Sequence, residues 1–375
     1  MRKTLKRIEF LSKQIYEFSK TVYKRPSVYK MDAYEDIEGL PAVDNERWTA
    51  FGEKDTWGEV PDTHCWFLIK APDVKFGKGV PVMGVSTGTT DDDWSVINPQ
   101  FMVYVDGYPI QALDANHREI FLSGRERKDV YLYAYNGLEF SSSIHMQISV
   151  FEYDQASLDL YYAVFNLLNI LNYTEVKSKE FSLILKKLNE FLGQIDFSQP
   201  RTESYYEEVR QANEKVQKEL LPALKDDFNP TAWSVGSSHL DVAWLWTVEQ
   251  SKEKAQRTVA TALELMRLFP DYKFFASQSL LYQYVKEYNP VLFEEIKQRV
   301  KEGRWDAGGG TYVEPDCNLV SGESFIRQIL FGKEFYKKEF GIESRICYIP
   351  DSFGFSGALP QIMKKAAWTI LLPPK

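Results

Sequence analysis

From residue 232 onward, the sequence alternates between short apolar runs and longer amphipathic stretches, and this alternation restricts the fold more than any other feature. Strands are predicted at 232–236, 274–278, 305–308 and 345–349. Helices are predicted at 244–268, at 282–301 with a break near Pro290, at 323–340 and around 360–363. The third helix should end at Gly341, because glycine often follows a helix end. Repeated strand–helix pairs predict a parallel sheet or part of a barrel.

Polar residues follow two of these strands. His239 and Asp241 come after the first strand, and Asp351 follows the fourth, within Pro350-Asp351-Ser352-Phe353-Gly354. Residues two apart in extended backbone face the same side, so His239 and Asp241 can converge on one ion. Zinc accepts such nitrogen and oxygen donors at about 2.0–2.2 Å. A structural hydrogen bond for the first pair, or a helix cap for Asp351, is the alternative. Polar groups at two strand ends of one sheet favour a functional site.

The glycine run Gly308-Gly309-Gly310 follows the third predicted strand. No Gly-Lys-Ser or Gly-Lys-Thr accompanies it, so a phosphate-binding loop is not predicted. Glycines at this place let the backbone pass close to a ligand or to a neighbouring strand. The next acidic residues, Glu314 and Asp316, are either carboxylates in the wall of a site or solvated loop charges.

The N-terminal half has a different pattern of apolar residues. Apolar residues from Thr4 to Val22 recur at steps of four and three, which predicts a helix that ends before Pro26. Such a helix either docks on its own chain or mediates self-association. Residues 156–225 return to helical spacing and predict a helical connector with an apolar face.

Between these helical segments, short apolar runs alternate with turn residues up to residue 153 and predict a β-sandwich. Asp106-Gly107 between two extended runs predicts a hairpin. The sandwich carries tryptophans that either fill the core or stack on carbohydrate: Trp48, Trp57, Trp66 and Trp94.

The overall composition excludes several classes of function. The net charge is −8 and no basic stripe accompanies the aromatic residues, so no nucleic-acid partner is expected. No apolar run approaches the roughly 20 residues that span a bilayer, and charges interrupt the N-terminus too often for a signal peptide. Cys65, Cys317 and Cys347 form no CxxC motif and indicate reduced thiols in a cytoplasmic protein.

The run His239-Leu240-Asp241-Val242-Ala243-Trp244-Leu245-Trp246 resembles the opening signature of glycoside hydrolase family 38, the α-mannosidases. Further motifs follow in family order: Gly303-Arg304-Trp305-Asp306, Asp316-Cys317-Asn318-Leu319, Ser321-Gly322-Glu323-Ser324 with Arg327-Gln328, Pro350-Asp351-Ser352-Phe353-Gly354, and Leu359-Pro360-Gln361-Ile362. They cover residues 230 to 366, and the preceding segments resemble the N-terminal region of the cytosolic and bacterial branch.

This resemblance implies a function and roles for individual residues. His239, Asp241 and Asp351 would bind Zn²⁺, and Asp351 would also be the catalytic nucleophile. Trp244 would stack against the mannose ring of a mannose-containing oligosaccharide. The family mechanism proceeds through a covalent mannosyl-enzyme with retention. Retaining glycosidases place their two catalytic carboxyls about 5–5.5 Å apart.

The resemblance also implies groups that are not evident in this sequence. The family supplies a second zinc-binding histidine and an acid/base aspartate well after the Pro-Asp-Ser-Phe-Gly motif. The histidines here are His64, His117, His145 and His239, and residues 352–375 contain no Asp or Glu. After Ala366 the sequence departs from the family pattern, which indicates a reading-frame break. The missing groups are therefore expected beyond Lys375, and the isolated chain is expected to be inactive.

The expected architecture is multidomain. It consists of an N-terminal helix (1–27), a β-sandwich (28–155), a helical connector (156–229) and a truncated α/β catalytic domain (230–375), which forms an incomplete (β/α) barrel of the α-mannosidase type. One alternative is a non-catalytic carbohydrate-binding or split-subunit protein that pairs with a separately encoded C-terminal remainder, and a homo-oligomer is also open. Another is a metal-dependent deacetylase, although the sequence lacks the HxxxH pair of that class.

Overall fold

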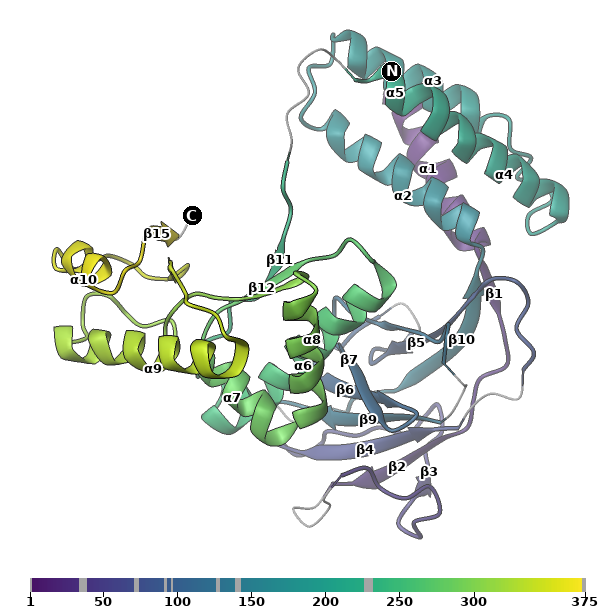
Figure 1. Cartoon of the computed structure of the whole chain (residues 1–375). Coiled ribbons are helices and arrows are strands. Elements are labelled where there is room, and N and C mark those ends of the chain that lie inside the picture. The colour runs from purple at the N-terminus through teal and green to yellow at the C-terminus, as the bar shows by residue number, and fades with distance from the viewer. Residues whose placement is uncertain are drawn as a thin grey trace.

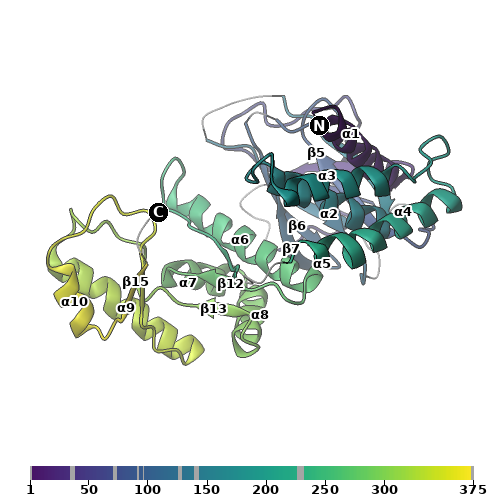
Figure 2. The same cartoon turned by 90° about the horizontal axis from the view of Figure 1, so that it is seen from above.

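The computed structural model describes residues 2–33, 39–70, 74–90, 93–95, 97–125, 129–138, 143–225 and 232–372. Figures 1 and 2 show a helical unit, a pair of antiparallel sheets and a C-terminal unit of alternating strands and helices. Within these ranges, every helix is too short or too polar to span a bilayer. The predicted start of the catalytic domain at residue 230 and the last residues, 373–375, lie outside the described residues.

The helical unit combines the N-terminal helix with the helices that follow the sheets. Its elements are α1 (Arg2–Phe18), α2 (Gln155–Leu171), α3 (Lys179–Leu192), α4 (Glu203–Lys215), the π-helical turn η1 (Val216–Leu220) and α5 (Leu221–Ala223). Ile8 and Ile15 of α1 are buried in one apolar core with Leu160, Leu188 and Val209 of α2, α3 and α4. The predicted docking of the N-terminal helix on its own chain is therefore confirmed, as is the helical period of the connector.

Helix α1 ends earlier than predicted. It stops at Phe18, and Val22 lies in strand β1 (Lys20–Val22), which pairs antiparallel with β10 (Gln147–Tyr153). Thr21 and Val22 are β-branched and favour extended backbone. Val22 is 67% exposed, so its helical spacing did not reflect a buried helix face, and Pro26 does not end the helix.

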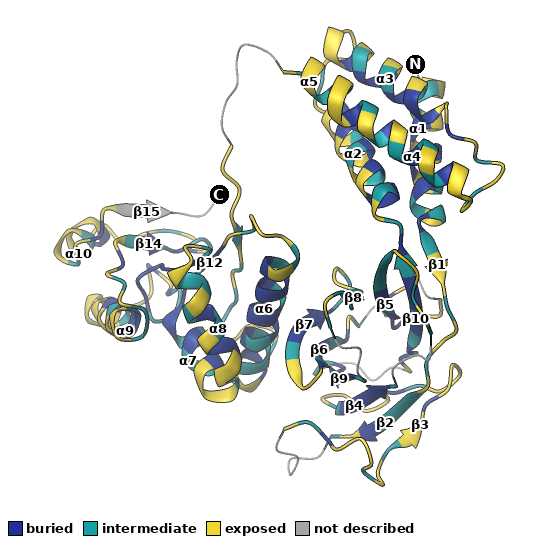
Figure 3. Ribbon diagram, turned by 45° about the vertical axis from the view of Figure 1, so that its right-hand side comes forward, coloured by how far each residue is buried: buried dark blue, intermediate teal, exposed yellow. Residues whose placement is uncertain are grey.

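The strands between the helical segments form two antiparallel sheets. Besides β1 and β10, they are β2 (Val28–Asp32), β3 (Thr49–Ala50), β4 (His64–Ile69), β5 (Val80–Ser86), β6 (Gln100–Val105), β7 (Tyr108–Leu113), β8 (Glu119–Phe121) and β9 (Val130–Tyr135). One sheet has the order β1-β10-β5-β8 and the other β3-β2-β4-β9-β6-β7. Both contribute to one apolar core, which includes Phe67, Phe101 and Leu132 from one sheet and Val85 and Val150 from the other (Figure 3).

The hairpin predicted at Asp106-Gly107 is confirmed. Strands β6 and β7 pair antiparallel on either side of it, and both turn residues have positive φ, 54° and 87°. Positive φ at both positions gives a turn that matches the twist of the flanking strands.

The tryptophans of the sheets fill cores. Trp57, Trp66 and Trp94 are 1%, 6% and 8% exposed, and Trp48 packs near Tyr131 with ring centroids 6.2 Å apart. The structural interpretation of these rings therefore holds for the three buried ones, because a buried face cannot stack on a sugar.

The C-terminal unit contains the predicted alternation, with shorter strands. Its strands are β11 (Gly236–Ser237), β12 (Phe274–Ala276), β13 (Trp305–Ala307), β14 (Ile346–Tyr348) and β15 (Ile370–Leu372), and its helices are α6 (Val248–Leu268), α7 (Ser279–Tyr288), α8 (Pro290–Lys301), α9 (Gly322–Phe340) and α10 (Leu359–Lys365). The helix break at Pro290 and the helix stop at Gly341, which has φ of 69°, are confirmed. The first strand was predicted too early, at 232–236.

Helix α6 begins at Val248 and not at Trp244 as predicted. Thr247 caps it: its Oγ1 accepts a hydrogen bond from the backbone N–H of Gln250, whose side chain accepts one from the N–H of Thr247. This reciprocal pair fixes the start of the helix. Residues 239–246 therefore remain irregular and can carry functional side chains.

The four predicted strands do not form one continuous sheet. Strands β11, β12 and β13 are parallel neighbours, whereas β14 pairs in parallel with β15 in a separate sheet. After β13 the chain turns at Gly309 and Gly310, with φ of 92° and 76°. Between β13 and β14, the N–H of Tyr348 donates a backbone hydrogen bond of 3.4 Å to the carbonyl of Gly309, just after β13. The sequence pattern did not indicate strand β15.

Helix α6 packs on strand β7 and joins the C-terminal unit to the sheets. Glu264 forms an ion pair of 2.8 Å with Arg125, and Glu253 lies 3.0 Å from Nε2 of His64. Burial alone would raise the pKa of Glu253, but His64 and Arg257 hold it below the usual value. These ionic contacts fix α6, and hence the segment before it, relative to the sheets.

Replacing Gly332 with alanine is expected to destabilise the C-terminal unit. Gly332 lies in the buried face of α9, and a Cβ there would sit 2.5 Å from the backbone carbon of Thr311. Such overpacking costs about 1–3 kcal/mol. Gly322, at the start of the same helix, has nothing within 4 Å of its Cβ position. Calorimetry should show a lower melting temperature for Gly332→Ala but not for Gly322→Ala. Equal behaviour of the two variants would contradict the close contact.

Candidate metal centre

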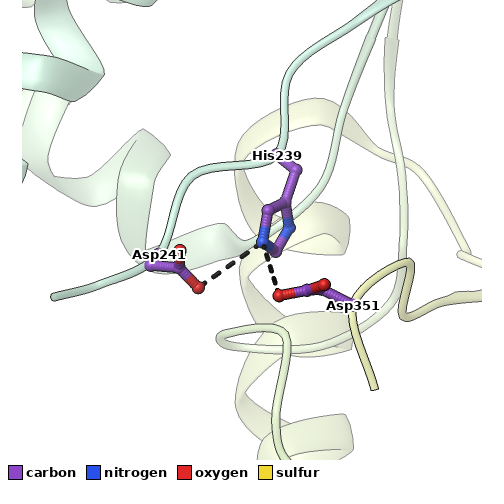
Figure 4. A group of neighbouring side chains, drawn as sticks. All are labelled: His239, Asp241 and Asp351. Atoms are coloured by element: carbon purple, nitrogen blue, oxygen red, sulfur yellow. Dashed lines mark ion pairs between the residues drawn. The ribbon is translucent and has the colours of Figure 1, made fainter. Parts of the chain in front are cut away.

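Three side chains converge beyond the ends of strands β11 and β14: His239, Asp241 and Asp351 (Figure 4). One ligand atom from each lies within 4.8 Å of the other two. Nε2 of His239 is 3.4 Å from Oδ1 of Asp241 and 3.6 Å from Oδ2 of Asp351. The structure thus brings together the three residues that the sequence singled out, although Asp351 lies far along the chain from the other two.

The cluster is open to solvent and suited in its chemistry to a cation. The exposed fractions of the side chains are 31% for His239, 39% for Asp241 and 54% for Asp351. Two carboxylates and an imidazole nitrogen offer oxygen and nitrogen donors, which zinc accepts. The two aspartates direct negative charge at one ring nitrogen, and a cation between them would relieve their repulsion.

Local hydrogen bonds hold the segments that carry the aspartates. Nε1 of Trp246 donates to the carbonyl of Asp241 and to Oγ of Ser251, each at 3.1 Å. After Asp351, the hydroxyl of Ser352 donates to the carbonyl of Gly354 at 3.0 Å. Gly354 has φ of 145°, and a Cβ there would lie 2.5 Å from a side-chain nitrogen of Asn318. Glycine is therefore required in this turn.

Glu314 contacts His239 from the opposite side of the ring. Its carboxylate is a hydrogen-bond partner of Nδ1 of His239 and accepts a hydrogen bond from the hydroxyl of Ser277. The Glu314 side chain is 4% exposed, and burial raises its pKa against the opposing effects of Ser277 and His239. Of the two interpretations that the sequence left open, Glu314 follows the first, as a carboxylate in the wall of the site.

Asp316 follows the second interpretation, as an exposed loop charge. Its carboxylate accepts hydrogen bonds from the backbone N–H groups of Asn318 and Leu319, at 2.8 and 2.6 Å. These bonds lower the pKa of Asp316. Its role is to close a turn, and it does not reach the cluster.

The sequence did not point to Ser277 and Gln278. Both are 2% exposed and directly follow strand β12, so they lie at the same end of the sheet as His239. Their position at the end of a predicted strand was the available signal, since β12 is the central strand of its sheet.

Trp244 lies between Asp241 and the capped start of α6. Its side chain is 68% exposed, and its ring meets the edge of Trp246 with centroids 5.7 Å apart. The exposed ring is therefore free to pack against a ligand, in contrast to the buried tryptophans of the sheets.

A cavity of about 400 Å³ lies beside the cluster, between the six-stranded sheet and α6. Its walls include His239, Gln100 and Lys254. Nζ of Lys254 donates to Oε1 of Gln100 at 3.1 Å and lies 4.5 Å above the ring of Trp246. Burial, the largest cause, and the nearby charge of Arg257 lower the pKa of Lys254 to about 8. No sequence pattern could indicate this cavity, because its walls come from two separate units.

Two further histidines have other partners. His64 lies in β4, stacks between Tyr133 and Tyr135 and pairs with Glu253, and His117 pairs with Asp114 at 3.0 Å. In the part of the chain that the structure describes, the metal-type cluster therefore contains one histidine, His239.

Comparison with known proteins gives a family match and several similar proteins. Residues 229–373 match the family described as glycosyl hydrolases family 38 N-terminal domain. Alpha-mannosidase G of Dictyostelium discoideum is 40% identical over 176 residues, which is 47% of this chain and 16% of that protein. Alpha-mannosidase 2C1 of Homo sapiens is 29% identical over 323 residues, which is 80% of this chain and 29% of that protein.

Among solved structures, the crystal structure of an alpha-mannosidase from Enterococcus faecalis V583 matches with 28% identity and a TM-score of 0.35. The match covers 37% of this chain and 16% of that one. The chain thus spans between 16% and 29% of the length of these relatives.

Proposed function

We propose that the chain contributes the nucleophile and metal ligands of a zinc-dependent, retaining α-mannosidase, because residues 229–373 match the N-terminal domain of glycosyl hydrolases family 38. Its substrate would be a mannose-containing oligosaccharide with a terminal α-mannosyl residue. The observation that carries the proposal is the convergence of His239, Asp241 and Asp351 within the segment that matches the family. The relatives named alpha-mannosidases support it.

His239, Asp241 and Asp351 would hold the zinc ion. The donor set fits, since imidazole nitrogen and carboxylate oxygens are common zinc ligands. When bound, zinc supplies a Lewis acid that binds sugar hydroxyls and orients the ring. The partial exposure of all three side chains leaves room for a sugar to approach them.

Asp351 would act as the nucleophile. Its carboxylate oxygen forms a bond to the anomeric carbon while the bond from that carbon to the leaving oxygen breaks, and a second carboxylic acid gives the leaving oxygen a proton. Water then attacks the anomeric carbon, releases the Asp351 carboxylate and returns a proton to the second carboxyl. Two displacements at one carbon retain its configuration. The 54% exposure of Asp351 is consistent with direct attack on a substrate.

Trp244 would provide the flat apolar surface for the mannose ring. Its exposed indole lies in the segment that also carries His239 and Asp241. Sugar rings expose C–H groups on one face, and aromatic rings pack favourably against such surfaces.

The same family assignment extends to the architecture. We propose that the two antiparallel sheets form a β-sandwich (28–155), that 156–229 is a connector and that 230–375 is part of a (β/α) barrel. The parallel order β11-β12-β13 and the core shared by the antiparallel sheets support this division. The N-terminal segment (1–27) shares the core of the connector helices.

We further propose a cytoplasmic location. Cys65, Cys317 and Cys347 are buried free thiols. Cytosolic proteins keep their cysteines reduced, whereas secreted proteins use them in disulfides.

The test measures zinc content and hydrolysis on one preparation. The chain is dialysed against zinc, its metal content is measured, and release of a chromophore from an aryl α-mannoside is followed with and without the product encoded downstream. We expect one zinc ion per chain. We also expect hydrolysis in at least one of the two arms, and Asp351→Asn should abolish it. Mannose binding without hydrolysis in both arms would favour a non-catalytic carbohydrate-binding or split-subunit protein instead. Absence of both zinc and hydrolysis overturns the proposal.

A further inference from the structure

The two ring nitrogens of His239 face different kinds of carboxylate. Nε2 faces Asp241 and Asp351, whose side chains are 39% and 54% exposed. Nδ1 faces Glu314, which is 4% exposed and lies deeper in the C-terminal unit. One side of the imidazole is therefore open to solvent and ligands, and the other is fixed to a buried acceptor.

We infer that Glu314 is a positioning residue, which holds His239 through an Nδ1–H hydrogen bond and so directs the Nε2 lone pair at the two aspartates. A carboxylate accepts hydrogen bonds and donates none, so the nitrogen beside it must carry the proton. A neutral imidazole has one N–H, which leaves Nε2 free to bind a cation. The inference rests on the proposed function, since it concerns how the proposed metal ligand is prepared.

The two residues that follow β12 hold Glu314 in place. The hydroxyl of Ser277, just after β12, donates to the Glu314 carboxylate. The side chain of Gln278 accepts a hydrogen bond of 3.2 Å from the N–H of Glu314 and donates one of 2.9 Å to the carbonyl of Leu240. Gln278 thus ties the residue next to His239 to the backbone of Glu314.

The backbone around these residues is adapted to this arrangement. Gln278 has φ of 65°, a conformation that non-glycine residues rarely adopt and that costs energy. Gly309 approaches Ser277 so closely that a Cβ at this glycine would lie 2.6 Å from Cβ of Ser277. A strained glutamine and a glycine at close approach indicate that the position of the Ser277–Gln278 segment matters more than its local conformational preference.

The general physics of metal sites gives the expected size of the effect. Partners that bind the second nitrogen of a metal-bound histidine fix its orientation and raise its basicity, and their loss typically costs 10–100-fold in metal affinity. Glu314→Ala should therefore weaken zinc binding by about 10–100-fold. Glu314→Gln, which keeps the shape of the side chain and removes its charge, should weaken it in the same direction and guards against a folding defect.

The matched control is Asp316→Asn. Asp316 lies two residues further on in the same segment and hydrogen-bonds only to the backbone of its own turn. This variant removes a negative charge near the site without touching His239. Its zinc affinity should stay within about threefold of that of the unmodified chain, because exposed charges interact weakly.

The experiment has two readouts on the full chain. Competition with a chromophoric chelator gives the zinc affinity, and long-range ¹H–¹⁵N correlation spectra of chain labelled at histidine nitrogens report the proton on Nδ1 of His239, assigned with His239→Asn. The unmodified chain should show a slowly exchanging Nδ1 proton that is absent in Glu314→Ala. Unchanged zinc affinity and an unchanged Nδ1 proton in Glu314→Ala would overturn the inference and leave the proposed function intact. No zinc binding by the unmodified chain, with the Nδ1 proton lost in Glu314→Ala, would count against the proposed function alone.

Discussion

Replacing His239 with alanine is expected to remove stable zinc binding from this chain. His239 is the group that both aspartates approach, at 3.4 and 3.6 Å from its Nε2, and it offers the nitrogen donor of the cluster. Loss of a direct ligand should exceed the 10–100-fold cost of losing a supporting partner, so a fall of more than about 100-fold in affinity is expected. Zinc content after dialysis, measured by elemental analysis, should drop from one ion per chain to a trace.

The control for this variant is another histidine of the same chain. His145 lies just before strand β10, is half-buried and is not part of the cluster. His145→Ala should keep zinc content and affinity unchanged. If the two variants bind zinc equally well, the ion is held elsewhere, and the assignment of His239, Asp241 and Asp351 as ligands is wrong.

Removal of the ion gives an independent check on the same site. Two aspartates and the buried Glu314 surround His239, so the empty site concentrates negative charge around one imidazole. A ligand that binds only the folded chain stabilises it by mass action. Chelation of zinc should therefore lower the melting temperature of the unmodified chain and leave that of His239→Ala unchanged.

The sequence grouped the three residues of the candidate site because each stands next to an element with a strong local signal. His239 and Asp241 follow an apolar run, and Asp351 follows another, so the rule that reactive groups gather at the ends of parallel strands was enough to group them. Trp244 came from the family motif and not from any spacing. Its exposure agrees with the role that we propose, but a single exposed tryptophan carries no such meaning by itself.

The supporting residues around the site escaped prediction for a physical reason. Ser277 and Gln278 act through hydrogen bonds to Glu314 and Leu240, which depend on how three separate segments pack side by side. Hydrophobic spacing carries no information about such contacts. The positive φ of Gln278 is equally invisible in a sequence, because glutamine has no preference for that conformation.

The predicted ends of helices and strands were wrong where tertiary contacts or helix caps overrode the local conformational preference of the sequence. The apolar spacing of residues 244–247 fits a helix, yet the reciprocal bonds of Thr247 and Gln250 start α6 later. Val22 fits the helical spacing of α1, yet pairing with β10 places it in a strand. The separation of β14 from β13 occurs after the glycine turn that follows β13, and glycines in a sequence do not by themselves indicate such a gap.

Replacing Trp305 with alanine is expected to cause a large loss of stability in the C-terminal unit. Trp305 lies in β13 and is 2% exposed. Its ring packs against Phe274 with centroids 4.8 Å apart, and its Nε1 donates to the hydroxyl of Tyr282 at 2.8 Å. Truncation of a buried tryptophan to alanine typically costs about 3–5 kcal/mol, because it removes apolar contacts and leaves a cavity.

The effect should be confined to the C-terminal unit at first. The helical unit has its own apolar core, so the chain is not expected to unfold in a single step. Hydrogen exchange resolves the units: amides of β12 and α7, which adjoin Trp305, should lose protection in Trp305→Ala, whereas those of α2 and α3 should keep it. The matched control is Trp233→Ala, because Trp233 is 88% exposed and such surface changes stay within about 0.5 kcal/mol. Equal protection of β12 in the two variants would show that Trp305 does not support this core.

Since β13 leads into the segment that carries Glu314, Trp305→Ala should also weaken zinc binding, whereas Trp233→Ala should not.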